Sequence, residues 1–281
     1  MDAAFRQGDI NHVAGDIQFA TALLQRRKTV LTVLDAGTFH RLSGVKKQVF
    51  RFFWFTLPIK QSAYVTTISD FSRQEILKVL GVQKQVVVIP VAVSDLFQFQ
   101  RKIFQSESPR ILIVGTAANK NIKRMIEALE SLPCKLIIVG NLSPEHVQLL
   151  KKLNINYENY VDLPLPLLIQ QYEKCDILAF CSTYEGFGMP IVEANSVGRV
   201  VVTSNVASIP EIAGDAACLV DPLSVESIRS GIRRVIHDNS YRESLIANGL
   251  INAKRFRPEQ VANQYWNVYS DLLEKNAFGH S

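Results

Sequence analysis

Two glutamates flank a turn with two glycines in a stretch that reads Tyr-Glu-Gly-Phe-Gly-Met-Pro-Ile-Val-Glu from residue 184 to residue 193. Glu185 and Glu193 are separated by seven residues. The run from Asp176 to Ser182 is mainly apolar and predicts a buried strand before the turn. Apolar residues at helical spacing after the turn predict a helix that ends at Gly198. We therefore expect both carboxylates where a strand is followed by a helix.

The turn itself suits a phosphate. The backbone amides of residues 186–189 come just before the expected helix, where unpaired amides and the positive end of the helix dipole favour an anion. Pro190 suits the first helical position, because the N–H that it lacks is not needed there. Gly186 and Gly188 allow a ligand close to the backbone and permit a positive φ.

The two carboxylates suit a sugar. Glu193, one turn into the helix, can accept two hydrogen bonds from a ribose diol, and Glu185 can reach a sugar hydroxyl from the loop. The stretch thus predicts a site for a nucleotide sugar. The alternative is a tight turn with two solvated glutamates, because one Gly-x-Gly turn is a weak signal by itself.

Length and composition indicate a globular protein of two domains, with 281 residues, 47% hydrophobic residues and 20% charged residues. The longest apolar runs are too short to span a membrane, and the first thirty residues lack a signal-peptide pattern, so a cytoplasmic location is expected. A net charge of +5 is compatible with anionic substrates or an anionic membrane, and does not indicate nucleic acid. The cysteines are far apart and lie in or beside apolar runs, which predicts reduced, buried thiols at Cys134, Cys175, Cys181 and Cys218.

Strands and helices alternate along the chain, which predicts parallel sheets covered by helices, an α/β fold. The first block, residues 1–100, has predicted strands at 11–15, 29–34, 64–68 and 86–91, and helices at 16–25 and 72–80. A polar, aperiodic stretch at 94–108 predicts a linker.

The second block, residues 109–258, repeats the alternation. Its strands are predicted at 111–115, 135–140, near 155, 176–182, 200–203 and 217–220, with helices that begin near 122, 143, 166 and 225 and at a capping box formed by Ser240 and Glu243. The last helix, within residues 259–281, is expected to pack back toward the N-terminal domain.

Several separated segments match a known family in the right order. They are Val114–Gly115 through Lys120–Asn121, Asp176–Ser182, Glu185–Glu193, and Ser208–Glu211 through Asp215 to Pro222. The chain resembles the retaining glycosyltransferases of family 4, also called glycosyl transferases group 1, with the GT-B fold of two facing Rossmann-like, doubly wound domains. The resemblance covers the C-terminal domain and, more weakly, the preceding block through Ile68–Ser72.

The resemblance implies transfer of a sugar from a nucleoside diphosphate sugar to a glycan or lipid-linked acceptor, with retention of the anomeric configuration, in cell-surface polysaccharide synthesis. It implies catalytic roles for Glu185 and for Lys120, which would meet the diphosphate. No metal and no cofactor are expected. The implied donor-binding residues are Gly115, Thr116, Lys120, Glu185, Gly186, Phe187, Gly188, Met189 and Glu193.

The first block departs from the family pattern, because it starts in what resembles the middle of the N-terminal domain. A sheet of about four strands would leave an edge and an apolar face for a partner chain. A second hypothesis follows, an incomplete, non-catalytic homologue that binds nucleotide or a partner chain. An epimerase or phosphorylase on the same fold is less favoured, and a dehydrogenase is disfavoured because the loop at Gly115 has no G-x-G-x-x-G.

Acceptor-side candidates lie near the end of the first predicted strand. The family frequently has a histidine before the aspartate that ends the next strand, but here Leu34 precedes Asp35. His12, Gly15 and Asp16 are therefore the acceptor-side candidates. The alternatives are a structural histidine and an aspartate that caps a helix.

A basic and aromatic segment follows, with Val49–Phe50 and Phe52–Phe55 among Arg41, Lys46, Lys47, Arg51 and Lys60. It predicts either peripheral contact with an anionic membrane, on its inner face, or a core helix with a solvated basic edge.

Overall fold

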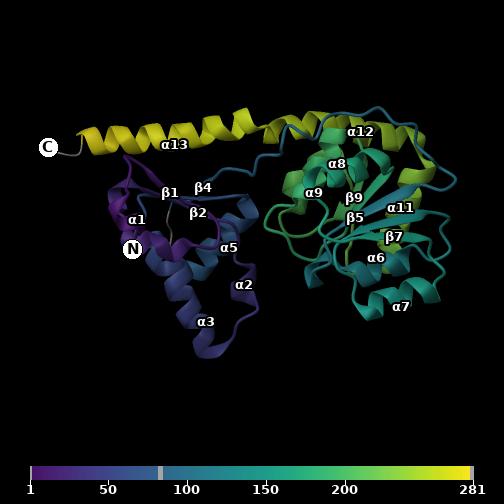
Figure 1. Ribbon diagram of the computed structural model, residues 1–281, viewed down its shortest axis with the longest axis horizontal. Helices are drawn as coiled ribbons and strands as arrows, with labels where there is room; N and C mark the ends of the chain where they lie inside the picture. Colours follow the sequence, from purple (N-terminus) through teal and green to yellow (C-terminus); the bar gives the residue numbers. More distant parts are fainter. Residues whose placement is uncertain (1, 82–84, 279–281) are drawn as a thin grey trace. The chain divides into compact units, whose positions relative to one another are not determined.

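The computed structural model describes residues 2–81 and 85–278 of the chain, which divides into two compact units (Figure 1). Unit 1 contains residues 1–91 and 259–281, and unit 2 contains residues 92–258. Each is described separately below.

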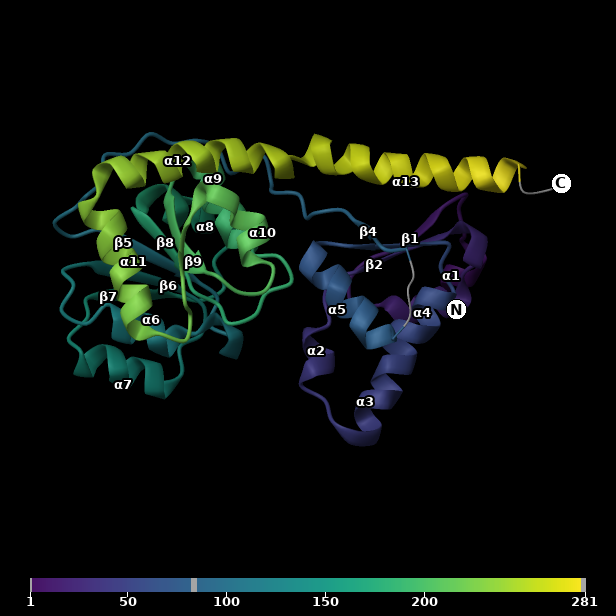
Figure 2. The same ribbon diagram turned by 180° about the vertical axis from the view of Figure 1, so that it is seen from behind.

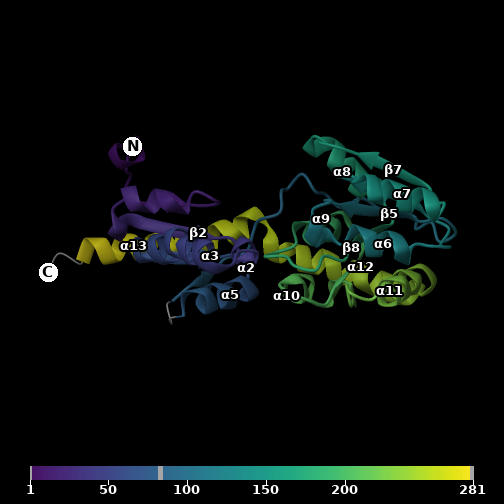
Figure 3. The same cartoon turned by 90° about the horizontal axis from the view of Figure 1, so that it is seen from below.

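Unit 2 is built on a six-stranded parallel sheet with the order β10-β9-β8-β5-β6-β7. The chain adds strands outward from β5 on one side and then outward from β8 on the other, so the order reverses between β5 and β8. Figure 3 shows this sequence of neighbours from β7 through β5 to β8. The strands are β5 (Arg110–Val114), β6 (Lys135–Val139), β7 (Tyr157–Tyr160), β8 (Ile177–Phe180), β9 (Val200–Ser204) and β10 (Cys218–Val220).

Helices cover both faces of this sheet. Ile111 and Ile113 join one buried cluster with helices on their side, whereas Leu112, which points to the other face, is buried as well. Figures 1 and 2 show α6 and α7 on one side and α8 and α9 on the other. The helices are α6 (Ile122–Ala128), α7 (Pro144–Lys152), α8 (Leu165–Lys174), α9 (Met189–Val197), α10 (Ile209–Ala213), α11 (Val225–His237) and α12 (Asn239–Ala253), with short 3₁₀ turns η4 (Ala118–Lys120), η5 (Gly214–Ala216) and η6 (Lys254–Phe256).

Most predicted elements of unit 2 are confirmed, as are the free, buried cysteines. The strand expected near residue 155 lies slightly later, at Tyr157–Tyr160. The predicted capping box at Ser240 is wrong, since α12 begins at Asn239 and the side chain of Asp238 accepts the cap hydrogen bond from the amide of Tyr241. Asp238, two positions before Ser240, satisfies the same end of the helix.

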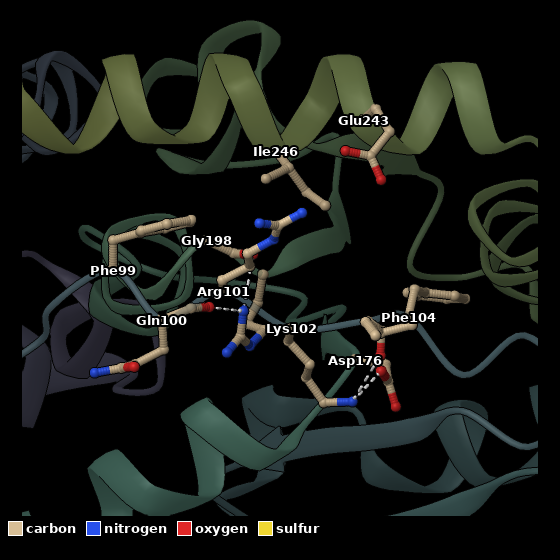
Figure 4. A pocket seen from close by; sticks show the side chains of 11 residues that line it. Phe99, Gln100, Arg101, Lys102, Phe104, Asp176, Gly198, Glu243 and Ile246 are labelled. Carbon is tan, nitrogen blue, oxygen red and sulfur yellow. Dashed lines mark hydrogen bonds and ion pairs between the residues drawn. The ribbon is translucent and has the colours of Figure 1, made fainter.

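The predicted linker at 94–108 is also wrong, because this segment packs on unit 2. The amide of Gln100 donates to the carbonyl of Val197 at 3.2 Å, and Lys102 pairs with the fully buried carboxylate of Asp176 (Figure 4). A buried carboxylate needs such a partner. Lys102, which its polar surroundings marked as part of a solvated linker, therefore anchors this segment to unit 2.

Unit 1 is built on a four-stranded parallel sheet with the order β1-β2-β3-β4. When parallel strands follow one another in chain order, right-handed crossovers put every connection between them on the same face of the sheet. Val13, Leu31, Val65 and Ile76 share the buried cluster on that face. The strands are β1 (Asn11–Val13), β2 (Thr29–Val33), β3 (Tyr64–Thr67) and β4 (Val87–Val88); the helices are α1 (Asp2–Phe5), η1 (Gln18–Leu23), η2 (Arg26–Lys28), α2 (Gly37–His40), α3 (Gly44–Phe50), the π-helical η3 (Arg51–Thr56), α4 (Leu57–Lys60) and α5 (Asp70–Leu80).

Helix α13 (Pro258–Phe278) covers the other face of this sheet, opposite α3 and α4 (Figure 2). Tyr269 of α13 hydrogen-bonds to His12 of β1, and Lys275 contacts Tyr64 of β3. The sheet thus has both faces covered by its own unit, contrary to the expected uncovered apolar face.

The helix predicted at residues 16–25 is only a 3₁₀ turn at Gln18–Leu23. Its N-cap residue is Ile17, with no side-chain hydrogen bond to the helix, so Asp16 does not act as a cap. Gly15, with a φ of +79°, turns the chain immediately before. A short turn without a cap does not nucleate a longer helix.

Candidate functional site

The predicted donor residues lie beyond the carboxyl ends of β5 and β8, the two strands between which the sheet order reverses. In open parallel sheets, ligands bind outside the carboxyl ends of the strands at this reversal. Gly115 follows β5 directly, and Glu185 stands in the loop after β8. The strand order therefore brings together two loops that are far apart in the sequence.

Lys120 and Glu185 form an ion pair between these loops. The ammonium of Lys120 lies 2.7 Å from Glu185 Oε1, and Asn119 Nδ2 donates to the same oxygen at 3.2 Å. The ammonium also lies over the ring of Phe180, 4.6 Å from its centre. Both charged side chains are partly exposed, at 19% and 14%. A phosphate oxygen and a sugar hydroxyl could thus each meet a fixed charge here.

Two asparagines hold the loops in register, and the sequence did not predict their roles. Asn119 Nδ2 donates to the carbonyl of Tyr184 at 2.9 Å. Asn121, buried at 6% exposure, donates to the carbonyls of Cys181 and Pro222 at 3.0 and 2.7 Å. Asn121 has a φ of +58°, the left-handed conformation that asparagine tolerates better than most residues. The sequence feature that could have indicated the role of Asn121 is its position immediately before a predicted helix.

Two glycines make room for the site. A Cβ on Gly115, where φ is +86°, would lie 3.0 Å from Lys120 Cε. A Cβ on Gly140 would lie 2.7 Å from Thr116 Oγ1. Gly140 follows the neighbouring strand β6, and the sequence predicted it only as the end of a strand. Its lack of a side chain allows the predicted donor residue Thr116 to stand where it does.

Ser208 stabilises the turn before α9 through two hydrogen bonds. Its Oγ lies 2.9 Å from the carbonyl of Glu185 and 3.0 Å from that of Phe187. Gly188, with a φ of +108°, is the N-cap of α9, so Met189 is the first helical residue and Pro190 the second, one position later than predicted. The side chain of Phe187 is buried edge-on against Phe256.

The side chain of Phe187 is therefore not available to a ligand, and the glycines on either side of it, Gly186 and Gly188, are buried as well.

Glu193 is held by a residue that the sequence did not predict. The hydroxyl of Tyr172 on α8 donates to Glu193 Oε2 at 2.5 Å. Burial raises the pKa of Glu193 above its ordinary value, while the Tyr172 hydrogen bond and the Lys120 charge oppose that rise. Burial also raises the pKa of Tyr172, which keeps its hydroxyl protonated as a donor. In the sequence, Tyr172 is only one residue of the helix predicted to begin near residue 166.

The acceptor-side candidates lie in unit 1. The ring nitrogens of His12 lie 2.7 Å from Tyr269 Oη and 2.7 Å from Thr32 Oγ1. Burial lowers the pKa of His12, which favours the neutral imidazole. Gly15 and the exposed Asp16 follow β1, at the carboxyl end of the sheet. Asp16 also lines a cavity of about 210 Å³. The other lining residues include Asp35, Phe39, Phe50, Trp54 and Phe55.

A larger cavity, of about 340 Å³, lies at the opposite edge of the unit 2 sheet (Figure 4). Asp176 and Gly198, which line it, precede β8 and β9, so the cavity is at the amino ends of the strands. Its buried carboxylate is paired with Lys102. Its position excludes it as part of the donor site.

Within residues 2–81 and 85–278, no three histidine, cysteine, aspartate or glutamate side chains come close enough together to bind a metal ion. No helix in the same residues has the length and apolar character needed to cross a membrane.

Comparison with known proteins identifies the family. The family profile described as "Glycosyl transferases group 1" matches residues 95–251. The chain belongs to this family. The match confirms the prediction of a group 1 glycosyltransferase, and it includes all of the donor residues that the sequence predicted.

Two mannosyltransferases of Escherichia coli are among the relatives. O-antigen chain mannosyltransferase B is 34% identical over 233 residues, which cover 74% of this chain and 60% of that protein. Serotype-specific mannosyltransferase WbdA is 24% identical over 234 residues, which cover 78% of this chain and 29% of that protein. The chain thus spans less than two thirds of the length of either relative.

Among solved structures, HepE of Anabaena in complex with UDP and glucose has a TM-score of 0.81 and is 18% identical, over 94% of this chain and 78% of that one. At this identity the likeness shows the fold alone. Together with the two parallel-sheet units, it confirms the predicted GT-B type fold of this group 1 member.

Proposed function

We propose that this chain transfers a hexose, with mannose as the first candidate, from a nucleoside diphosphate sugar to a growing cell-surface polysaccharide, with retention of the anomeric configuration. The placement of Lys120, Glu185 and Glu193 beyond β5 and β8 carries this proposal. The names of the E. coli relatives support mannose and O-antigen synthesis, and the UDP and glucose complex of HepE supports a nucleotide-sugar donor.

In the proposed reaction, an acceptor hydroxyl attacks the anomeric carbon on the face from which the diphosphate leaves. The bond between that carbon and the β-phosphate oxygen breaks, the new glycosidic bond forms, and the acceptor proton passes to the departing diphosphate oxygen. Lys120 and the amides before α9 stabilise the negative charge that builds on the diphosphate. Glu185 orients the transferred sugar through a hydroxyl, and no protein nucleophile is needed.

The acceptor is proposed to bind in unit 1, near His12, Gly15 and Asp16. The cavity beside Asp16 combines two carboxylates, from Asp16 and Asp35, with the aromatic ring of Trp54. Carboxylates accept hydrogen bonds from sugar hydroxyls, and aromatic rings pack on the apolar faces of sugars. This composition suits a glycan or the sugar of a lipid-linked acceptor.

We also propose a cytoplasmic location, with peripheral contact between α3 and η3 and the inner face of an anionic membrane. Val45, Val49, Phe52 and Phe53 are all about half exposed or more, at 79%, 51%, 49% and 49%. The opposite side of the same helical stretch is apolar as well and packs in the unit 1 core through Phe55. Apolar side chains on both sides, with lysines beside the exposed stripe, suit a helix that covers the core and touches lipid.

A partner chain is a further proposal. It would pair at an edge strand of the unit 1 sheet, β1 or β4, because both faces of that sheet are covered.

Calorimetry with UDP, GDP and their mannose and glucose derivatives, on the wild type and on Glu193→Ala, tests the donor site. The wild type should bind one nucleotide series, and Glu193→Ala should bind it at least tenfold more weakly. Release of nucleoside diphosphate, with and without an oligosaccharide acceptor, then tests turnover. Binding without any release would favour the non-catalytic alternative, and no binding at all would overturn the donor site.

A further inference from the structure

We infer that Tyr172 is a positioning residue for the donor, one that orients the Glu193 carboxylate toward the ribose. This inference rests on the proposed function. Its source is a contact between two side chains that lie on different helices, 21 positions apart in the sequence.

The contact has an unusual setting for a hydroxyl. Tyr172 has no exposed surface, and its hydroxyl donates to Glu193 Oε2 at 2.5 Å. In the described part of the chain, the second oxygen of that carboxylate, Oε1, has no hydrogen-bond partner. A carboxylate fixed through one oxygen presents the other in a single direction. That direction is available to a ligand group that donates, such as a ribose hydroxyl.

The ring of Tyr172 is fixed by its surroundings, so the hydroxyl cannot swing away from Glu193. Phe97 packs edge-on against it, with ring centres 5.4 Å apart. The carbonyl of Tyr172 accepts hydrogen bonds from Arg199 Nε at 3.0 Å and from the thiol of Cys175 at 3.3 Å. Phe97 belongs to the segment that the sequence predicted as a linker. That segment therefore helps to fix the ring of Tyr172.

The same hydroxyl counters a cost of burial. A buried carboxylate tends to take up a proton, and a neutral acid accepts hydrogen bonds poorly. Tyr172 from α8 and Lys120 from η4 both favour the ionised form of Glu193. Asn252 of α12, another neighbour of α9, contacts Asn195 instead of Glu193.

Tyr172→Phe tests the inference, because it removes the hydroxyl and leaves the ring against Phe97. The measurement is the affinity for the intact nucleotide sugar, whose diphosphate does not titrate in this range, from pH 5 to pH 8.5. The variant should bind about tenfold more weakly at pH 7. The pH below which its affinity falls should also lie higher than in the wild type, because loss of the donor lets the pKa of Glu193 rise further.

Tyr160→Phe is the matched control, since it removes a tyrosine hydroxyl that donates at 2.9 Å to another glutamate, Glu158, on the edge strand β7. It should bind as the wild type does at every pH. The affinity of Glu193→Gln for the nucleotide sugar should not depend on pH. The double variant with Tyr172→Phe should show no pH dependence either.

The outcomes separate the two proposals. A wild type that binds no nucleotide sugar overturns the proposed function. A wild type that binds, with a Tyr172→Phe variant of the same affinity and pH profile, overturns the role of Tyr172 alone. A uniform loss at every pH, with a lower urea midpoint of unfolding, would make Tyr172 a merely structural residue and overturn the inference too.

Discussion

The ammonium of Lys120 and the carboxylate of Glu185 meet at 2.7 Å across 65 positions of sequence. Each comes from a loop after a different strand, and the strands are neighbours only because the sheet order reverses between them. The pair holds a positive and a negative group side by side, one suited to a diphosphate and the other to a sugar hydroxyl.

Replacement of Lys120 by alanine should weaken binding of a nucleoside diphosphate about 10-fold to 100-fold, the effect of losing a charge-assisted hydrogen bond. Binding of the nucleoside alone should change less than about threefold. Titration calorimetry with both ligands measures the difference. Lys123→Ala, at an exposed lysine of the following helix, is the control. Equal losses for both ligands would contradict a phosphate role.

Glu185→Gln should act on turnover more than on binding. The amide can still accept a hydrogen bond, but it carries no charge next to Lys120. We expect kcat to fall about 100-fold while the donor affinity stays within about threefold, which steady-state kinetics and calorimetry would separate. Glu130→Gln, at an exposed position, serves as the control. A change in KM with an unchanged kcat would contradict this prediction, because it would show that Glu185 contributes only to substrate binding.

Glu193 should make the protein less stable as the pH rises. Its pKa in the folded chain is raised from 4.5 by burial, so the fold favours the neutral acid. Its stabilising contribution is therefore complete below pH 4.5 and is lost as the pH rises through the folded pKa. Glu193→Gln, which stays neutral, should have the higher free energy of unfolding at pH 7 to 8.

Urea denaturation at several pH values measures that comparison. The difference between Glu193→Gln and the wild type should shrink as the pH is lowered to 4.5. A difference that does not change with pH would show that ionisation of Glu193 is not its cause.

Gly231→Ala should destabilise unit 2, although alanine normally favours a helix by about 1 kcal/mol over glycine. The new Cβ would lie 2.4 Å from Val220 Cγ1 and 3.3 Å from Cys218 Sγ, where α11 packs on β10. Overpacking costs about 1–3 kcal/mol, so a net loss of up to about 2 kcal/mol is expected. Urea denaturation compares it with Ser230→Ala, an exposed neighbour that should cause no loss.

Replacement of Phe52 and Phe53 together by serine should reduce binding to lipid vesicles, because both rings lie in the exposed stripe. Replacement of Lys46 and Lys47 by alanine should weaken binding about 30-fold for anionic vesicles only, at about 1 kcal/mol for each lysine. Co-sedimentation with neutral and anionic vesicles measures both. Leu223→Ser, at a 65% exposed position of unit 2, should have no effect. Unchanged vesicle binding by the Phe52 and Phe53 variant would refute the proposed membrane contact.

Periodic patterns in the sequence predicted most of the fold, because the alternation of strands and helices is a local property. The failures have local causes as well. The stretch at 94–108 has no period, and its polar residues resemble a linker until the buried Asp176 is seen to need Lys102. At the start of α12 the sequence indicated a cap at Ser240, but the side chain of Asp238 makes the hydrogen bond.

The sequence by itself determined the family, the α/β class and the residue types that suit a diphosphate and a sugar, because these depend on motifs and their order. Tertiary structure decided which of those residues meet. Lys120 reaches Glu185, Asn121 joins two loops, and Tyr172 holds Glu193. The physical reason is strand order: parallel strands bring their carboxyl ends together, and which strands become neighbours is set by non-local packing that no local period records.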